Sequence, residues 1–523
     1  MIQSKLYYLI FIFFIFFKCN SISSFAQSNT YLSIESVIDQ TLESCPAIAI
    51  SKKNIVIASG LVKVSLNPFD PKFSIQTSKD IIVMPNNLYQ RLKGNSYSKT
   101  DNLSYSIDYK QKFRYGTTIN PSIQFVNYGK DSLFNTDNPL YTGLYANRTN
   151  ASLTIIQPIL NGFGKKFNTF EEEVSQIQYR ISELSYYEDV SASIYQSLTA
   201  YLEYIYANKV ALIQKETEQW LINLDNQIAY LVKMDALPKA DQKYVSALIA
   251  SRLAYKEESE LNLLIRKKEL GKAMGISIEK VKLLPLPPED FYTKSITSFD
   301  TSGYLKMSIE KSISSKNDIK KYQAELEKAE LEEKYSRLNL KQEFNITFNI
   351  GYNGIFESRE FDQLYKPYYE NIYGFNYFVG ISYTLDPRNQ KKKGELMKSI
   401  ANKEIAETKM DLLINNTKLE IDNCFRKIIT YNKIAKNLKT AVDYNKEALD
   451  NEYTKLKLGT TTLINLIQLQ INYYETFLDY YTSLLNLNSS LLSYRYMTGT
   501  LINVSNESIV KIDREKLFTL PFN

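Results

Sequence analysis

The sequence contains no histidine and very few cysteines, three in 523 residues. Histidine is the commonest general base and a frequent metal ligand, so an enzyme built from this chain would depend on carboxylates spread over its helices. We therefore expect no catalytic residue, no cofactor site and no metal site. Cys45 and Cys424 lie far apart within helical patterns, which favours two buried free thiols over a disulfide framework.

Long hydrophobic runs are missing beyond the N-terminus. The apolar run Leu6 to Phe17 follows Lys5 and precedes the small residues around Ala26, which is the layout of a signal peptide. We expect residues 1–26 to be removed and the mature chain to begin near Gln27. No later run has the length of a transmembrane helix.

A large excess of one charge is absent as well. The chain carries 63 Lys and Arg against 57 Asp and Glu, and removal of Lys5 and Lys18 with the leader leaves 61 against 57, a net charge of +4. This balance is too mild to indicate nucleic acid binding. Cys19 follows Lys18 where a lipid-attachment motif needs a small residue, so we expect no lipid at Cys19.

Aromatic residues, in contrast, are abundant: they make up 13% of the chain, with 41 Tyr. Together with aliphatic residues they occupy every second position in separated blocks, which predicts strands with one apolar and one polar face. Such strands suit an outer-membrane barrel, where lipid meets one face and water the other, but any one of them fits a soluble β-sandwich equally well. The predicted strands are 73–77, 103–113, 117–127, 151–157, 344–352 and 375–385.

Between these blocks lie two helical patterns of unusual length, 170–233 and 395–458. Apolar residues recur in both mostly at three- and four-residue steps, which is typical of coiled-coil helices. Each pattern is about 65 residues long and would span roughly 100 Å at 1.5 Å per residue. We expect turns at 234–243 and 456–468, and returning helices that end at glycine C-caps, Gly275 and Gly499.

The two halves of the chain keep the same internal spacing. Gly275 and Gly499 are 224 residues apart, and so are Asp241 and Asn465 in the two turns. We interpret the chain as an internal duplication of a strand block followed by a helical hairpin. The predicted segments are a signal peptide (1–26), a first repeat (27–281), a proline-containing linker (282–304), a second repeat (305–502) and a C-terminal tail (503–523).

Four stretches carry a resemblance to a known family. They read LTIIQPILNGFGKKFN (153–168), SIEKSISSKNDIKKYQAELEKAELEEKYSRLNL (308–340), YTLDPRNQKKKGEL (383–396) and YTKLKLGTTTLINLIQLQ (453–470). In this order and spacing they resemble the TolC-like outer membrane efflux proteins over nearly the whole mature chain. The resemblance implies a mainly α fold with a transmembrane β-barrel portion, in which three protomers pool their strands in one barrel and their helices in a hollow α-barrel.

In function, the resemblance implies an outer membrane exit duct of a tripartite efflux or type I secretion system. Such a homotrimer would sit in outer membrane lipid and receive its substrate from a periplasmic adaptor and an inner-membrane pump. The alternative is an exported periplasmic or surface coiled-coil structural protein without transport activity. That alternative explains the long helices and the duplication, but it gives no reason for the aromatic strands.

A duct needs hinges and a gate rather than catalytic residues. The strand-to-helix hinge is expected at Pro158, Gly162 and Gly164, because proline ends a strand ladder and glycine gives the backbone freedom to turn. Pro387 stands in the corresponding place in the second half.

The resemblance also places a candidate periplasmic gate in the two helical turns. Asn465 and Gln468 stand where the family has acidic residues, and Thr461 stands where it has an arginine, so the family's cation-selecting acidic rings are absent. Asp241 matches an aspartate that braces the closed state in the family.

The same turns are the expected docking surface for the adaptor. The candidate docking residues are Leu237, Pro238, Leu458, Gly459 and Leu463, and the apolar members give the surface physical plausibility.

The strand pair 103–113 and 117–127 is additional to the four strands per protomer that the family usually has. We expect its short turn, Arg114 to Gly116, on the periplasmic side and two long loops, 80–101 and 128–148, outside. Either this hairpin joins and widens the barrel, or it lies over the barrel's mouth. The second arrangement is slightly favoured by the sequence alone.

Overall fold

The computed structural model describes residues 31–92, 97–132, 144–235, 238–288, 290–291, 301–358, 360, 363–370, 372–504 and 510–522. The predicted signal peptide and Leu237 therefore lie outside the described residues. The chain forms two compact units. We call them the sheet unit (Lys53–Ser185 and Asp318–Leu413) and the helical unit (Met1–Lys52, Tyr186–Asn317 and Ile414–Asn523).

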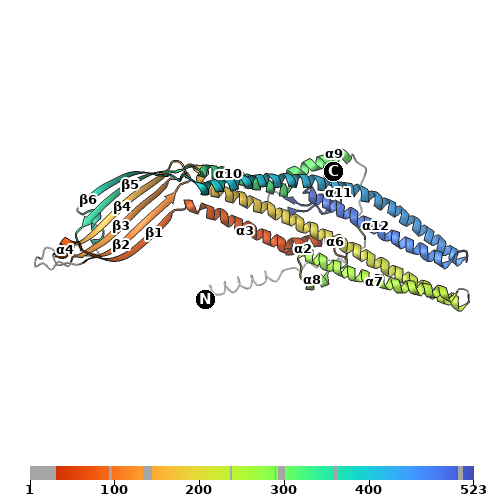
Figure 1. Cartoon of the computed structure of the whole chain (residues 1–523). Helices are drawn as coiled ribbons and strands as arrows, with labels where there is room; N and C mark the ends of the chain where they lie inside the picture. The colour runs from red at the N-terminus through yellow and green to blue at the C-terminus, as the bar shows by residue number, and fades with distance from the viewer. Residues whose placement is uncertain are drawn as a thin grey trace, which may run out of the picture. The chain divides into compact units, whose positions relative to one another are not determined.

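The sheet unit contains one six-stranded antiparallel sheet in which every strand pairs with its neighbours in chain order. β1 and β6 form its two edges (Figure 1). The strands are β1 (Lys72–Pro85), β2 (Tyr97–Lys112), β3 (Thr118–Ser132), β4 (Leu144–Pro158), β5 (Glu343–Phe356) and β6 (Ile372–Thr384).

The register of the strands places the predicted alternation on two continuous faces. On the apolar face Ile107 of β2 lies opposite Ile75 of β1 and Ile123 of β3. On the polar face Thr154 of β4 lies opposite Asn349 of β5, and the Asn349 side chain donates a hydrogen bond of 2.7 Å to the Thr154 hydroxyl. The two-faced pattern predicted from the sequence is confirmed.

The strands are longer than predicted, and the two long loops are correspondingly shorter. β1 and β2 pair as far as Pro85 and Tyr97, and β3 and β4 extend to Ser132 and Leu144. Charged residues break the alternation near Lys79 and hide this extension in the sequence. In the sheet Lys79 forms an ion pair of 3.6 Å with Asp101 of the neighbouring strand, so the charges lie on a paired ladder rather than in a loop.

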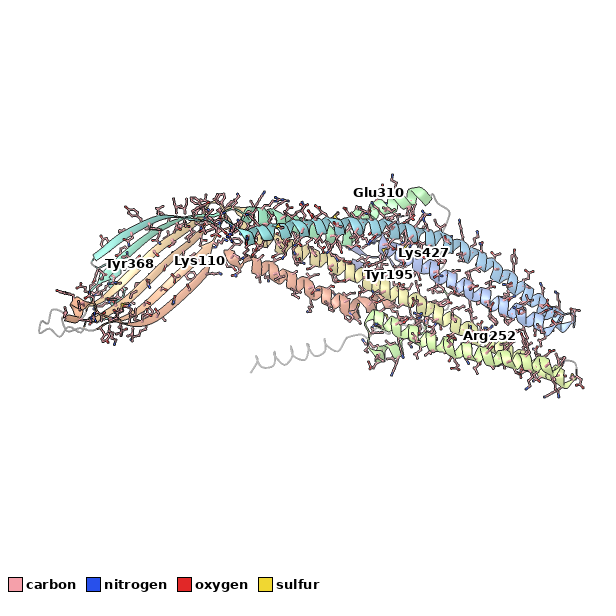
Figure 2. The ribbon with its side chains drawn as sticks, in the orientation of Figure 1. Lys110, Tyr195, Arg252, Glu310, Tyr368 and Lys427 are labelled. Atoms are coloured by element: carbon pink, nitrogen blue, oxygen red, sulfur yellow. The ribbon has the colours of Figure 1, made fainter. Side chains whose placement is uncertain are left out.

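Described residues of the connection between β5 and β6 pack on the apolar face near Tyr352 and Asn147. The connection contains the 3-10 helix η4 (Lys366–Tyr368), and the Tyr352 hydroxyl donates hydrogen bonds to the carbonyls of Pro367 (3.2 Å) and Tyr368 (2.9 Å). Figure 2 labels Tyr368 at this place. Asn147 and Thr149 of β4 are buried there, so two polar side chains on this mainly apolar face are shielded from solvent.

The helices follow the predicted pattern closely. α6 begins and ends at the predicted residues, and α11 begins five residues before its predicted start at Glu395. Gly275 is the C-cap of α7, with φ 73°, whereas α12 ends at the cap Thr498, one residue before Gly499. The helices are α2 (Ile34–Ser44), α3 (Pro46–Leu66), α4 (Leu88–Leu92), α5 (Lys165–Asn168), α6 (Phe170–Lys233), α7 (Lys239–Met274), α8 (Ile278–Leu283), α9 (Thr301–Ser315), α10 (Asn317–Asn339), α11 (Gln390–Lys457) and α12 (Leu463–Met497).

The helical unit has a large core that includes the C-terminal tail. Tyr201, Tyr204 and Tyr494 are fully buried in it, and Phe518 of the tail packs into the same cluster. The Arg495 guanidinium donates a 2.9 Å hydrogen bond to the Thr519 carbonyl. The described tail residues 510–522 therefore contribute to the packed core.

Cys45 and Cys424 are free and buried, as predicted. Burial raises the pKa of the Cys424 thiol. Over the described ranges, no single helix is long and apolar enough to cross a membrane, although Ile34–Ser44 and Pro46–Phe69, bent by 43°, meet that test as a pair.

Candidate functional site: strand-to-helix hinges and hairpin turns

The first hinge links the end of β4 to α5. Gly162 and Gly164 both have positive φ, 88° and 90°, a conformation that L side chains rarely adopt. The Asn168 side chain donates hydrogen bonds to their carbonyls, 2.7 Å to Gly162 and 2.9 Å to Gly164. β4 ends at Pro158 and α5 begins at Lys165, so the chain passes from strand to helix across six residues, and the Asn168 side chain braces this link.

The short turn between β2 and β3 packs directly onto this hinge. Gly116, with φ 98°, lies so close to the Gly162 carbonyl oxygen that a Cβ at Gly116 would meet it at 2.3 Å. The Gly164 amide donates to the Tyr115 carbonyl at 3.2 Å. The Arg114 guanidinium donates to both carboxylate oxygens of Glu172 on α6, at 3.2 and 3.3 Å. Turn and hinge form one interlocked junction.

The second hinge is built from different residues. Pro387 is exposed between the end of β6 and α11, and the residue with positive φ is Asn389 at 46°. The buried Asn389 side chain donates a hydrogen bond of 3.1 Å to the Leu340 carbonyl. The backbone N–H of Asn389 donates one of 2.9 Å to the Asp386 carboxylate. Sequence reasoning missed Asn389, although asparagine, like glycine, can adopt this left-handed conformation.

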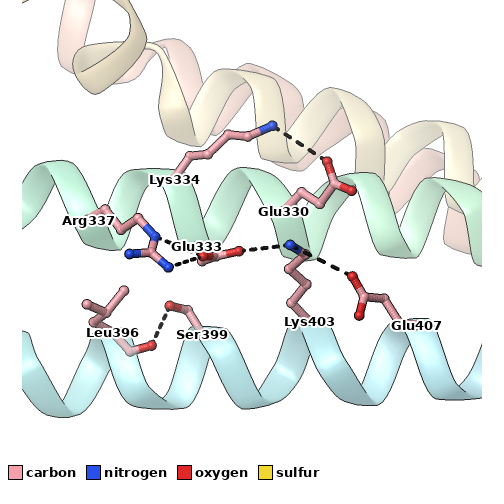
Figure 3. Close-up of polar contacts among 8 residues, drawn as sticks. All are labelled: Glu330, Glu333, Lys334, Arg337, Leu396, Ser399, Lys403 and Glu407. Carbon is pink, nitrogen blue, oxygen red and sulfur yellow. Dashed lines mark hydrogen bonds and ion pairs between the residues drawn. The ribbon is translucent and has the colours of Figure 1, made fainter.

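Charged residues tie α10 to α11 beside the second hinge (Figure 3). The Glu333 carboxylate accepts hydrogen bonds from the Arg337 guanidinium, at 2.6 and 2.8 Å, and forms an ion pair of 3.2 Å with Lys403. Lys403 also lies 3.8 Å from Glu407. Arg337, and next Lys403, hold the pKa of Glu333 below its usual range, and Glu333 raises the pKa of Lys403.

A cavity of about 510 Å³ opens at the same end of the sheet. Its lining includes Lys72 and Lys110, which lie directly opposite each other on the polar face, and Lys112. Figure 2 labels Lys110 here. Asp70 and Glu343 line it too, so the cavity is polar without a strong excess of either charge.

The second helical turn joins α11 to α12 through Gly459, which has φ 70°. The Thr460 amide donates to the Lys455 carbonyl at 3.0 Å and the Gly459 amide to the Leu456 carbonyl at 3.0 Å, the pattern of a helix C-terminus closed by a left-handed residue. The Thr462 hydroxyl then accepts from the Asn465 amide at 3.3 Å as the N-cap of α12.

Of the predicted gate residues in this turn, Thr461 has the most specific contact. Its hydroxyl donates a hydrogen bond to the Glu452 carboxylate, which also forms an ion pair of 3.2 Å with Lys455. These contacts, the Thr461 bond first, hold the pKa of Glu452 below its usual range. Sequence reasoning missed Glu452. Gln468 is exposed and donates to Asn472 at 3.0 Å, and Asn465 is exposed beside it.

The first helical turn leaves α6 through Asp235, which has φ 54°, and enters α7 at the N-cap Pro238. Asp241 lies in the first turn of α7 and is half-buried. Its amide donates to the Pro238 carbonyl at 3.1 Å, and within the described part of the chain its carboxylate has no hydrogen bond or ion pair. The negative charge at a helix N-terminus is itself favourable.

A small hydrophobic cluster, which we call the turn cluster, packs the two helical hairpins together behind their turns. Leu463, a docking candidate from the sequence, is buried in it at 6% exposure, and its side chain packs against the neighbouring hairpin. Leu458 and Ile464 are the exposed apolar residues of this turn, at 73% and 59%. The turn cluster consists of Leu224, Ile228, Val245, Leu463, Leu466 and Ile467.

Within the described ranges, no group of three or more cysteine, aspartate or glutamate residues is placed to hold a metal ion. The arrangement consists of two strand-to-helix hinges, two helical turns and a sheet with one mainly apolar and one mainly polar face.

No family model and no curated protein matches the sequence. Solved structures do match. The chain is similar to the CmeC outer membrane channel of Campylobacter jejuni, with a TM-score of 0.64 and 13% identity over 89% of this chain and 85% of that one. It is also similar to the open state of the MtrE outer membrane channel of Neisseria gonorrhoeae (TM-score 0.60, 13% identity, 89% and 88%) and to the outer membrane protein VceC of Vibrio cholerae (TM-score 0.60, 12% identity, 89% and 96%).

Proposed function

Because this chain has the TolC-like fold, we propose that it is the outer membrane exit duct of a tripartite efflux or type I secretion system. It acts as a homotrimer that passively conducts substrates from a periplasmic adaptor and an inner-membrane pump to the outside of a Gram-negative cell. The observation that carries the proposal is the two-faced sheet, which a hinge joins to long helices in the same chain.

The sheet's apolar face supports insertion into lipid. On β6 it presents Phe375, Tyr377 and Ile381, exposed at 70%, 84% and 69%. The opposite face carries mainly serine, threonine, asparagine and glutamine, which suits a water-filled lumen. A soluble sandwich would cover the aromatic face with a second sheet, and the described part of the sheet unit has one large sheet.

The helices support assembly from several copies. α7 exposes a series of aliphatic side chains that no described element covers, and burying such a stripe against another copy is favourable. A duct formed in this way needs a polar lumen and a gate and no catalysis. The exposed residues of α7 are Leu253, Leu261, Leu264 and Ile265.

The gate in this proposal lies at the helical turns and carries no acidic ring. Asn465 and Gln468 are neutral, so we expect weak selection for cations and no block by multivalent cations. Of the four candidate gate residues only Asp241 is charged, and Thr461 acts through its bond to Glu452, which ties the second turn to the end of α11.

Adaptor docking is assigned to the exposed residues of the turns. In the second turn these are Leu458, Gly459 and Ile464, and in the first turn Pro238. Leu237 remains a candidate from the sequence alone.

The test is deletion of the gene in the native host, followed by complementation. Restoration of export or drug efflux, with the chain in the outer membrane fraction, supports the duct. An outer membrane chain whose loss leaves export, secretion and efflux unchanged would support the structural alternative.

Leu458→Asp is the variant that tests docking, with Leu458→Met as its matched control. We expect the Asp variant to assemble normally, to lose export and to lose co-purification of an adaptor, whereas the Met variant keeps both. If the two variants show equal export and equal co-purification of an adaptor, Leu458 is not part of the docking surface.

A further inference from the structure

The additional hairpin is an integral part of the sheet. The β1–β2 ladder runs from the Lys72–Lys110 pair to the Pro85–Tyr97 pair, and β3 pairs with β4 along nearly its whole length. The arrangement slightly favoured by the sequence, a hairpin lying over the barrel's mouth, is therefore wrong. The β2–β3 ladder is interrupted opposite Pro121, which has no amide hydrogen to donate, and it resumes in the same register.

Side-chain chemistry supports this placement independently. Ile107 and Ile123 continue the apolar face from β1 to β4, and Ser106 and Gln124 continue the polar face. A hairpin above the mouth would meet water on both faces, so it would gain nothing from this alternation. At its other end the hairpin's turn is interlocked with the first hinge through Gly116 and Arg114.

The two edges of the sheet are left unpaired. Every residue of β1 except Ser78 is exposed, and so is nearly the whole of β6, whereas the inner strands are mostly half-buried. The two edge strands have similar lengths, 14 and 13 residues. Long, apolar, unpaired edges are avoided in stable proteins unless another strand covers them.

We propose that β6 of one copy pairs with β1 of the next, and that three copies close an eighteen-stranded barrel. An even number of strands in an up-and-down sheet makes β1 and β6 run in opposite directions, so this junction is antiparallel like all the others. Each contact joins two different edges, and a ring of such contacts removes every free edge. The number of copies rests on the proposed function, whereas the pairing of β6 with β1 rests on the sheet alone.

The consequence is a wider outer-membrane section than four strands per protomer would give. Barrel diameter grows roughly linearly with strand number, so eighteen strands give a diameter about 1.5 times that of twelve and a cross-section about twice as large. Barrels of this size leave an aqueous channel. The middle of the polar face, which would line the lumen, carries mainly uncharged side chains such as Ser106, Gln124 and Thr154.

The experiment is disulfide cross-linking in native outer membranes. Ser78→Cys in β1 is combined in turn with each of four positions on the same face of β6, and the copies are separated on a non-reducing gel. The four variants scan the unknown register between copies: Asn376→Cys, Phe378→Cys, Gly380→Cys and Ser382→Cys. Val379→Cys, on the opposite face, is the matched control, and Thr154→Cys with Asn349→Cys, which lie opposite each other within one chain, is the positive control.

We expect covalent dimers and trimers from at least one same-face combination and none from the Val379→Cys control. A second pair distinguishes the alternative arrangement: Gln76→Cys with Thr154→Cys joins β1 to β4, which are three strand spacings or about 14 Å apart here. That distance is too long for a disulfide. A β1–β4 cross-link, or the absence of any β6–β1 cross-link while the positive control forms, would overturn the eighteen-stranded barrel. Export by the uncross-linked chain is measured separately. A failure of the eighteen-stranded barrel would therefore leave the proposed exit-duct function intact as long as export is restored.

Discussion

The interlocked junction makes a quantitative prediction about Gly116. Substitution by alanine forces an L side chain into φ 98° and places its Cβ 2.3 Å from the Gly162 carbonyl oxygen. The conformational strain costs about 1–2 kcal/mol, and forcing an extra methyl group into a packed site adds typically about 1–3 kcal/mol. We therefore expect Gly116→Ala to destabilise the sheet unit by about 2–5 kcal/mol.

Two matched glycines separate these contributions. Gly164 has φ 90° but open space around its Cβ position, so Gly164→Ala should lose only the strain, about 1–2 kcal/mol. Gly394 has neither a positive φ nor a neighbour within 4 Å and lies inside α11, so Gly394→Ala should be neutral or stabilising by about 0.5–1 kcal/mol.

The assay is the midpoint temperature at which the purified assembly in detergent loses its folded gel mobility. The predicted order of midpoints is Gly116→Ala lowest, Gly164→Ala next, and Gly394→Ala at or above the parent. If Gly116→Ala melts with or above Gly164→Ala, the packing of the β2–β3 turn on the hinge is not as described.

Three further predictions follow from the packing and the charges. Leu466→Ala in the turn cluster should cost about 2–5 kcal/mol in chemical denaturation, and the exposed Ile464→Ala less than about 1 kcal/mol; equal costs would refute the cluster. Glu333→Gln should lower the melting midpoint at pH 7, and the difference should vanish as the pH falls through the lowered pKa of Glu333, because the carboxylate stabilises the fold only while it is ionised. Burial raises the pKa of Tyr304 to about 12, so stability should fall between pH 10 and about 12, where tyrosine in the unfolded chain ionises first. Tyr304→Phe should reduce that fall, as followed by melting across this range.

Much of the fold could be predicted from the sequence because it depends on local periodicity. The bounds of α6 and the left-handed cap at Gly275 follow from an unbroken three- and four-residue pattern and from one glycine. The alternation of β5 likewise fixes which side chains share a face.

Neighbour relations could not be predicted, because alternation assigns a face to each residue and says nothing about which strand lies beside it. The placement of β2 and β3 inside the sheet is of this kind. The extension of β1 past Lys79 was hidden for a related reason, since its ion pair with Asp101 forms only once the strands are in register.

The position of the first strand-to-helix link could be predicted from its glycines, whereas the contacts that depend on tertiary structure could not. The first hinge has positive φ angles at residues 162 and 164, which is why glycine stands at both positions. The roles of Asn389 and Glu452 depend on hydrogen bonds with Leu340 and Thr461, which local periodicity does not reveal. Leu463 likewise faces the other hairpin rather than solvent.

Electron microscopy of the mature chain extracted from outer membranes tests the central claim most directly. The account predicts a hollow particle with a threefold axis and an eighteen-stranded barrel that continues into a helical stem. A solid rod, or a particle without a threefold axis, would contradict the exit duct and favour the structural alternative.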